Sequence, residues 1–91
     1  MTDEQRIVHF GGDVQGVGFR YTACRTALGY EITGYVRNLP DGQVECVVEG
    51  ACEQIDAFVD ELCHRMGRYV RETNQQKAPH SGEFADFSVR Y

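Results

Sequence analysis

Two glycines and an arginine stand together near the beginning of the sequence, in the stretch Val14-Gln15-Gly16-Val17-Gly18-Phe19-Arg20. Glycine adopts backbone conformations that are costly for other residues, so a glycine-rich loop can turn several successive N–H groups toward one point. A helix that begins at the end of such a loop adds unpaired N–H groups and a partial positive charge. The arginine adds a planar guanidinium that can bind two phosphate oxygens at once. The stretch is therefore typical of a site for a small phosphate or a similar anion.

The spacing of these glycines excludes two common phosphate-binding motifs. A dinucleotide-binding fingerprint needs a third glycine at position 21, where the sequence has Tyr21. A P-loop needs a lysine followed by serine or threonine, and none closes this loop. Gly-Val-Gly-Phe also resembles part of the RNP1 motif, but that motif belongs to a central strand of a basic domain. A glycine-rich turn that only joins a strand to a helix remains the alternative interpretation.

The charge of the chain limits its partners. The 91 residues include 9 Lys and Arg against 14 Asp and Glu, which gives a formal net charge of −5. This balance argues against nucleic acid or an anionic membrane surface as the main partner. Positive and negative residues are equal in number over residues 1–40, so the whole surplus of acids lies in residues 41–91. The half of the chain that contains the glycine-rich loop therefore has no net negative charge to repel an anion.

The sequence predicts one cytoplasmic domain, residues 1–91, which we expect to be a monomer. No apolar run is long enough to cross a bilayer, and the first residues are too polar for a signal peptide. The cysteines form no C-x-x-C pair, and their spacing gives little support for zinc; they are Cys24, Cys46, Cys52 and Cys63. We expect free thiols in a reducing cytosol, with Cys24 and Cys46 packed in the core.

The hydrophobic pattern predicts strands and helices in the order βαββαβ, with a fifth strand at the end of the chain. The predicted strands are residues 6–12, 32–38, 43–49, 69–76 and 84–91, and the predicted helices are residues 21–29 and 52–65. The turn Leu39-Pro40-Asp41-Gly42 makes the second and third strands a hairpin. This order indicates a ferredoxin-like α+β sandwich, with an antiparallel sheet and both helices on one face.

The other face of the predicted sheet is left open. Gln43, Glu45 and Glu49 alternate along the third strand, and we expect them to be solvated on this face. The three histidines stand apart from any pattern of base and nucleophile, and we expect them at surface or edge positions; they are His9, His64 and His80.

Several segments of the chain carry a resemblance to one family. Gly12-Asp13-Val14-Gln15-Gly16-Val17-Gly18-Phe19-Arg20, Gly34-Tyr35-Val36-Arg37-Asn38 and Asp41-Gly42-Gln43-Val44-Glu45 closely resemble segments of acylphosphatases. The resemblance extends to Glu49-Gly50 and to Phe87-Ser88-Val89-Arg90-Tyr91, so it covers nearly the whole chain. It implies the βαββαβ sandwich and hydrolysis of the carboxyl–phosphate bond of acyl phosphates to a carboxylate and inorganic phosphate.

The resemblance also implies roles for particular residues. Arg20 matches the arginine that binds phosphate, and Asn38 matches the asparagine that orients the attacking water. The backbone N–H groups from Gln15 to Arg20 would form the phosphate cradle, which adds Gly16, Val17, Gly18 and Phe19 to the predicted substrate-binding residues.

Two positions depart from the common family pattern without affecting Arg20 or Asn38. Asp13 stands where a basic residue is frequent, and a carboxylate beside the anion site is expected to weaken substrate binding. Gly67 is followed by Arg68 instead of the usual proline.

The implied reaction agrees with the residue types that the motif lacks. Because the leaving group is a weakly basic carboxylate, no general acid is needed to protonate it. The remaining tasks are to hold the phosphoryl group, to neutralise its charge and to direct a water in line. We therefore expect no metal, no cofactor and no covalent intermediate, with inorganic phosphate as product and competitive inhibitor.

The sequence leaves two other classes of function open. The first is a binding module that holds phosphate, carbamoyl phosphate or a nucleotide without hydrolysis, as in acylphosphatase-like domains of larger maturation enzymes. No second domain is expected here, which favours the free enzyme. The second is an RNA-binding sheet whose exposed aromatic residues stack on bases, and the acidic charge argues against it.

Overall fold

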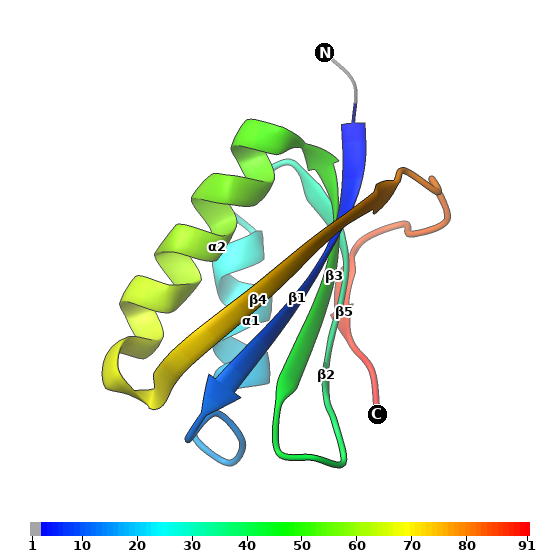
Figure 1. Ribbon diagram of the computed structural model, residues 1–91. Helices are drawn as coiled ribbons and strands as arrows, with labels where there is room; N and C mark the ends of the chain where they lie inside the picture. Colours follow the sequence, from blue (N-terminus) through cyan, green and yellow to red (C-terminus); the bar gives the residue numbers. More distant parts are fainter. Residues whose placement is uncertain (1–2) are drawn as a thin grey trace.

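The computed structural model describes residues 3–91 and shows one five-stranded sheet with two helices packed on one of its faces (Figure 1). The sheet order is β4-β1-β3-β2-β5. In chain order the elements are β1 (Asp3–Gly12), α1 (Phe19–Ala27), β2 (Ile32–Asn38), β3 (Val44–Ala51), α2 (Cys52–Met66), a 3₁₀ turn η1 (Gly67–Tyr69), β4 (Val70–Pro79) and β5 (Phe87–Val89). The predicted ferredoxin-like α+β fold is confirmed.

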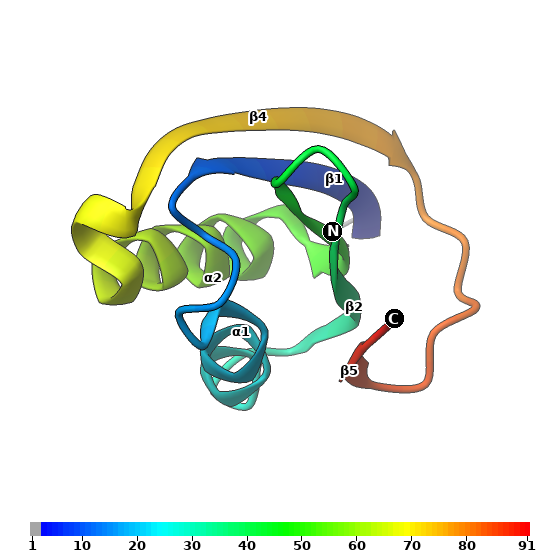
Figure 2. The same cartoon turned by 90° about the horizontal axis from the view of Figure 1, so that it is seen from below.

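The sheet is mixed rather than wholly antiparallel, because its last strand runs parallel to its neighbour. β3 pairs antiparallel with both β1 and β2, and β4 pairs antiparallel with β1, whereas β5 pairs parallel with β2. β4 and β5 lie at opposite edges, so the segment 80–86 must cross from one edge to the other on the side away from the helices (Figure 2). The strands β1, β2 and β5 consequently run in one direction and end at the same end of the sheet.

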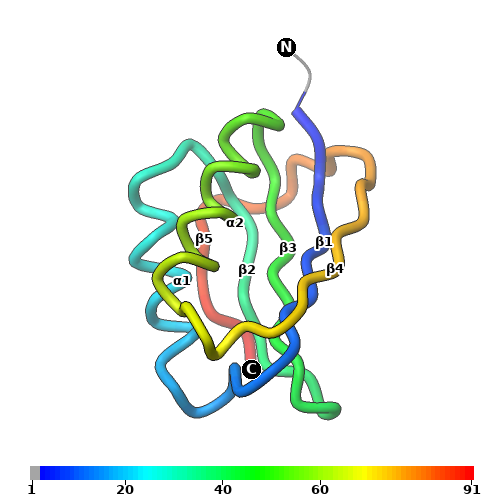
Figure 3. The backbone as a smooth tube through the Cα atoms, turned by 60° about the vertical axis from the view of Figure 1, so that its left-hand side comes forward, coloured from blue at the N-terminus to red at the C-terminus, as the bar shows by residue number. Residues whose placement is uncertain are grey.

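The core lies between the helices and one face of the sheet, as alternation along the strands predicts. Val8 and Phe10 of β1 face the helices and are fully buried. The predicted apolar stripe of α2 is also buried; it consists of Ile55, Phe58, Val59 and Leu62. At full burial each of these side chains contributes about 1.5–3 kcal/mol to folding. This layer fixes α1 and α2 against the sheet. Figure 3 shows the backbone of both helices lying over the strands.

Several element boundaries differ from the prediction. α1 begins at Phe19 instead of residue 21, directly after the glycine-rich loop. β4 continues to Pro79, because residues 77–79 pair with β1 and are not a loop. β5 is confined to Phe87–Val89, since only these residues pair with β2.

The prediction that Glu45 and Glu49 are solvated is wrong. Glu45 is only 8% exposed, because it lies in a network with His9 at 2.8 Å and Arg37 at 2.8 Å. Burial by itself would raise the pKa of Glu45, but hydrogen bonds from His9 and Arg37 outweigh it and lower the pKa. A central strand therefore carries carboxylates on its open face because each has its own partners.

Glu49 holds the crossing segment 80–86 against the sheet. Its carboxylate is completely buried and accepts hydrogen bonds from the backbone N–H groups of Ser81 and Gly82, each at 2.9 Å, and from the Ser81 hydroxyl at 2.7 Å. Gln5 of β1 donates a further bond to the same carboxylate. Burial opposes ionisation of this group, but these hydrogen bonds prevail and lower the pKa of Glu49 to about 2.

Candidate active site

The glycine-rich loop ends in a helix start that has no side-chain cap. Gly16 and Gly18 have φ angles of 79° and 77°, in the left-handed region that favours glycine. A Cβ at either position would meet nothing within 4 Å, so these glycines are needed for backbone conformation and not for space. The first turn of α1 contains no acidic residue and no side-chain cap. Its N–H groups therefore remain available to an anion at this end of the helix.

Two buried side chains anchor the loop on either side of its exposed glycines. Val14 is fully buried and Phe19 is 2% exposed. The Phe19 ring packs on the Phe10 ring with centroids 4.9 Å apart. The loop is thus attached to the core at both ends, which holds its backbone in place before any ligand arrives.

The loop and the strand ends enclose a hollow of about 380 Å³. Five of the predicted site residues line it together, namely Gly16, Gly18, Phe19, Arg20 and Asn38. They meet because β1 and β2, which lie on either side of β3, run in the same direction and end at the same end of the sheet. The other lining residues are Val14, Tyr21, Cys24, Val89 and Tyr91.

Gln15 and Val17, both predicted as cradle residues, do not line this hollow. Val17 is half-buried against the core. The side chain of Gln15 is directed to the β2–β3 turn, where its amide donates to the carbonyl of Leu39 at 2.8 Å and to that of Gln43 at 2.9 Å. Leu39 follows Asn38 directly, so this side chain connects the phosphate loop to the residue predicted to hold water.

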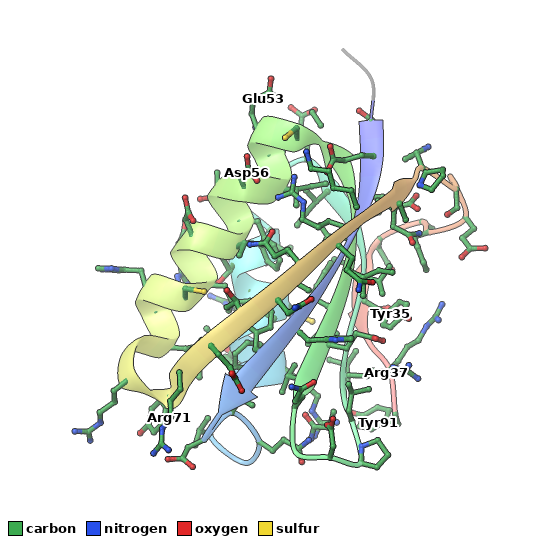
Figure 4. The ribbon with its side chains drawn as sticks, in the orientation of Figure 1. Tyr35, Arg37, Glu53, Asp56, Arg71 and Tyr91 are labelled. Carbon is green, nitrogen blue, oxygen red and sulfur yellow. The ribbon has the colours of Figure 1, made fainter. Side chains whose placement is uncertain are left out.

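Arg20 lies in the first turn of α1 with its guanidinium 5.2 Å from the centroid of the Tyr91 ring. Figure 4 shows Tyr91 at the end of the sheet where β2 also ends. Within residues 3–91 no carboxylate forms an ion pair with Arg20. Its positive charge is therefore available to an anion in the hollow.

Sequence reasoning missed five residues of the hollow, of which Val14 directly precedes the predicted cradle. Tyr21 and Cys24 follow Arg20 on α1, where helical spacing gave an indication of their position. Val89 and Tyr91 reach the hollow only through the parallel pairing of β5 with β2, which no local pattern indicates. Burial, reinforced by the charge of Asp86, raises the pKa of the Cys24 thiol, so this thiol is protonated at neutral pH.

Asp13 does not line the hollow. Its carboxylate lies 3.2 Å from Arg71 of β4, and both side chains are more than 70% exposed. The expected weakening of substrate binding by Asp13 stays a prediction, and the pairing with Arg71 reduces the charge that a bound anion meets.

The cysteines and other potential ligands show no metal cluster in the described region. All four cysteines are free thiols, and Cys46 is buried as expected while Cys24 is half-buried. Among residues 3–91, no group of three or more His, Cys, Asp or Glu side chains could hold a metal ion. No helix in the same range is long and apolar enough to span a membrane.

The fold and the loop together define a class: ferredoxin-like α+β proteins with a glycine-rich loop before the first helix. A family model described as acylphosphatase matches residues 6–89. An acylphosphatase of Pasteurella multocida is 42% identical over 92 residues, covering 100% of both chains. An acylphosphatase of Methylococcus capsulatus is 44% identical over 80 residues, covering 86% of each. The crystal structure of acylphosphatase from Bacillus subtilis matches with a TM-score of 0.88 and 29% identity, covering 97% of this chain and 99% of that one.

The chain belongs to the acylphosphatase family. The function of this family is the hydrolysis of acyl phosphates, and the chain is accordingly an acylphosphate phosphohydrolase.

Proposed function

We propose that this enzyme hydrolyses small acyl phosphates by in-line attack of an oriented water, with Arg20 and Asn38 as its catalytic residues. The observation that carries the proposal is that Arg20, the first turn of α1 and Asn38 line one hollow. A cation, a set of backbone donors and a neutral amide are the groups that this reaction needs.

Arg20 and the backbone N–H groups of the loop hold the phosphoryl group. The left-handed backbone of Gly16 and Gly18 curves the loop around the hollow, and the uncapped start of α1 directs further N–H groups to it. The guanidinium of Arg20 binds two phosphoryl oxygens in its planar fork. These donors are in place before the reaction, so they stabilise the charge that develops on the equatorial oxygens.

Asn38 holds the attacking water from the side of β2. Its side-chain amide offers one acceptor and one donor group, which together fix both the position and the orientation of a water molecule. The water oxygen forms a bond to phosphorus while the bond from phosphorus to the acyl oxygen breaks, and that electron pair leaves with the carboxylate. A proton of the water passes to a phosphoryl oxygen, so the products are the carboxylate and inorganic phosphate.

The proposed reaction needs no metal ion because the loop and Arg20 supply the positive charge. The carboxylate leaves without a proton, so no general acid is required either. Inorganic phosphate resembles the group that the loop binds, and it is accordingly the product and a competitive inhibitor.

We also propose that residues 1–91 act as a single cytoplasmic domain and as a monomer. Four free thiols favour a reducing compartment. The net charge of −5 favours a small anion at a local cationic site over nucleic acid or an anionic membrane.

Turnover of benzoyl phosphate with and without EDTA tests the proposal. We expect hydrolysis that is unaffected by EDTA, is not increased by Mg²⁺ and is inhibited competitively by inorganic phosphate. A requirement for Mg²⁺ would overturn the metal-free mechanism. Binding of phosphate without turnover would instead indicate a binding module.

A further inference from the structure

A second hollow lies beside the first, between the later part of α1 and β5. It has a volume of about 400 Å³ and is lined by Cys24, Ala27, Leu28, Tyr30, Ile32, Thr33, Ala85, Asp86 and Phe87. Cys24 lines both hollows, so they are adjacent at this residue. The mechanism proposed above uses no residue of the second hollow.

Each of the two hollows has at least one large, exposed hydrophobic side chain in its wall. Tyr21 is 70% exposed and Leu28 is 81% exposed, and they lie on α1 or at its end with Cys24 between them. Tyr21, Cys24 and Leu28 are spaced at i, i+3 and i+7, so they form one stripe along the helix. Tyr91, another exposed large hydrophobic residue, lies where the stripe begins. Of the four such residues in 3–91, only Tyr69 is elsewhere.

The stripe begins where the acyl part of a substrate must leave the cradle. The phosphoryl group is held at Gly16, Gly18 and Arg20, and the acyl group projects from it into the rest of the first hollow. The remaining walls of that hollow are mostly apolar, and two of them are Cys24 and Val89. The second hollow lies next to these walls and shares Cys24 with them.

We propose that the groove between α1 and β5, which joins the two hollows at Cys24, binds an uncharged aliphatic chain of the acyl phosphate. This inference rests on the proposed function, because it needs the phosphoryl group in the cradle. It names the substrate class of the site: medium-chain acyl phosphates are preferred to acetyl phosphate. Phosphate oxygens are bound at one end of the groove and methylene groups along it.

The length and the charge of the groove limit the chain. From Arg20 to Leu28 the helix rises about 12 Å, which corresponds to about eight to ten carbons of an extended chain. Ile32 and Phe87 provide an apolar wall at the far end, and the acidic Asp86 lines the same hollow. A chain that ends in a carboxylate would be repelled there, so the preferred chain is uncharged.

The rate of hydrolysis as a function of chain length tests this proposal. The substrates are acetyl, butanoyl, hexanoyl and octanoyl phosphate, each below its micellar concentration, with benzoyl phosphate as a short reference. Complete burial of a methylene group favours binding about fourfold, and a groove open on one side should retain about twofold for each. We therefore expect kcat/KM to rise roughly fifteenfold from butanoyl to octanoyl phosphate.

Leu28→Gln, with Tyr69→Ser as its matched control, tests whether the second hollow causes the preference. Leu28 is 81% exposed and Tyr69 is 39% exposed, and neither belongs to the hydrophobic core cluster. Leu28→Gln should reduce kcat/KM for octanoyl phosphate about threefold through lost apolar contact, and leave benzoyl phosphate unchanged. Tyr69→Ser should change neither value. An equal loss on both substrates in Leu28→Gln would overturn the proposal.

Binding without turnover is measured by NMR with methylphosphonate and octylphosphonate. Both should shift the amide signals of Gly16, Gly18 and Arg20, whereas only octylphosphonate should shift those of Leu28 and Ala85. A flat chain-length series together with normal hydrolysis of benzoyl phosphate would refute the groove and leave the proposed function intact. Absence of any turnover would refute the proposed function itself. A concentration-dependent dimer abolished by Leu28→Gln, with no shift at Ala85, would assign the groove to a second copy and overturn the proposal.

Discussion

The side chain of Gln15 allows a test of how the two halves of the active site are held together. Its amide donates to the carbonyls of Leu39 and Gln43, at 2.8 and 2.9 Å, and thereby connects the phosphate loop to the turn after Asn38. Gln15→Leu keeps a side chain of similar size and removes both hydrogen bonds. The two carbonyls lie at an exposed turn, so water can replace the lost donor.

The magnitudes expected for Gln15→Leu follow from this geometry. Two exposed neutral hydrogen bonds contribute about 1 kcal/mol together, so the melting temperature should fall by about 4–8 °C. A displacement of about 1 Å between reacting groups can cost a hundredfold in rate, and a partly loosened turn should cost about tenfold in kcat. The phosphate inhibition constant should change less than twofold, because Arg20 and the backbone N–H groups of the loop are unaltered.

The assay compares kcat on benzoyl phosphate with the inhibition constant of phosphate and with thermal melting. Gln76→Leu is the matched control, since Gln76 is an exposed glutamine of β4 far from the hollow. Gln15→Glu has the right size but no donor, so it should lose at least as much activity as Gln15→Leu. If Gln15→Leu melts at a lower temperature and yet keeps kcat within twofold of wild type, the glutamine stabilises the turn without positioning Asn38.

Three further substitutions test the site and the fold. Arg20→Lys should raise the phosphate inhibition constant and lower kcat steeply, because an ammonium offers one point charge where the planar fork binds two oxygens; near wild-type kinetics would exclude Arg20 as the phosphate ligand. Asn38→Ala should lower kcat by about a hundredfold, or about 2.7 kcal/mol, with phosphate inhibition unchanged; loss of inhibition would place Asn38 in the cradle instead. The pKa of Glu49 is about 2 in the folded protein, against 4.5 for a free carboxyl. The ionised carboxylate therefore contributes about 3 kcal/mol to the free energy of unfolding. This contribution is complete above pH 4.5 and is lost as the pH falls toward 2. Glu49→Gln should therefore lower the free energy of unfolding in urea at pH 7 and flatten its dependence between pH 4.5 and 2.5, and an unchanged slope would contradict this.

The parts of the site that lie close together in the sequence could be predicted from it. The two glycines and Arg20 occupy one short segment, so their residue types alone indicate an anion loop before a helix. The side chain of Gln15 could not be assigned in this way, because its partners are carbonyls more than twenty residues away. Every residue has a backbone carbonyl, so the residue types do not indicate which carbonyl accepts a hydrogen bond from Gln15.

Two errors in the fold, the solvation of Glu49 and the direction of β5, have a common physical origin in the crossing segment 80–86. Glu49 alternates with apolar residues and so has the pattern of a solvated position, yet Ser81 and Gly82 cover it. The direction of β5 depends on the same segment, because a chain that crosses the sheet can enter the far edge in either direction. The local residue pattern therefore determines neither the burial of Glu49 nor the direction of β5.

The common direction of β1, β2 and β5 has a consequence for the order in which the molecule opens. The proposed active site combines the loop after β1, Asn38 of β2 and the residues at the end of β5, and β5 is an edge strand of only three residues. Short edge strands exchange their amide hydrogens through local opening that costs far less than global unfolding. Detachment of β5 would remove Val89 and Tyr91 from the hollow and separate Phe87 from Phe58 of α2, while the pairing of β3 with β1 and β2 stayed intact. Catalytic competence should therefore disappear at a lower temperature than the bulk of the secondary structure, and a bound phosphate should slow hydrogen exchange first in residues 87–91.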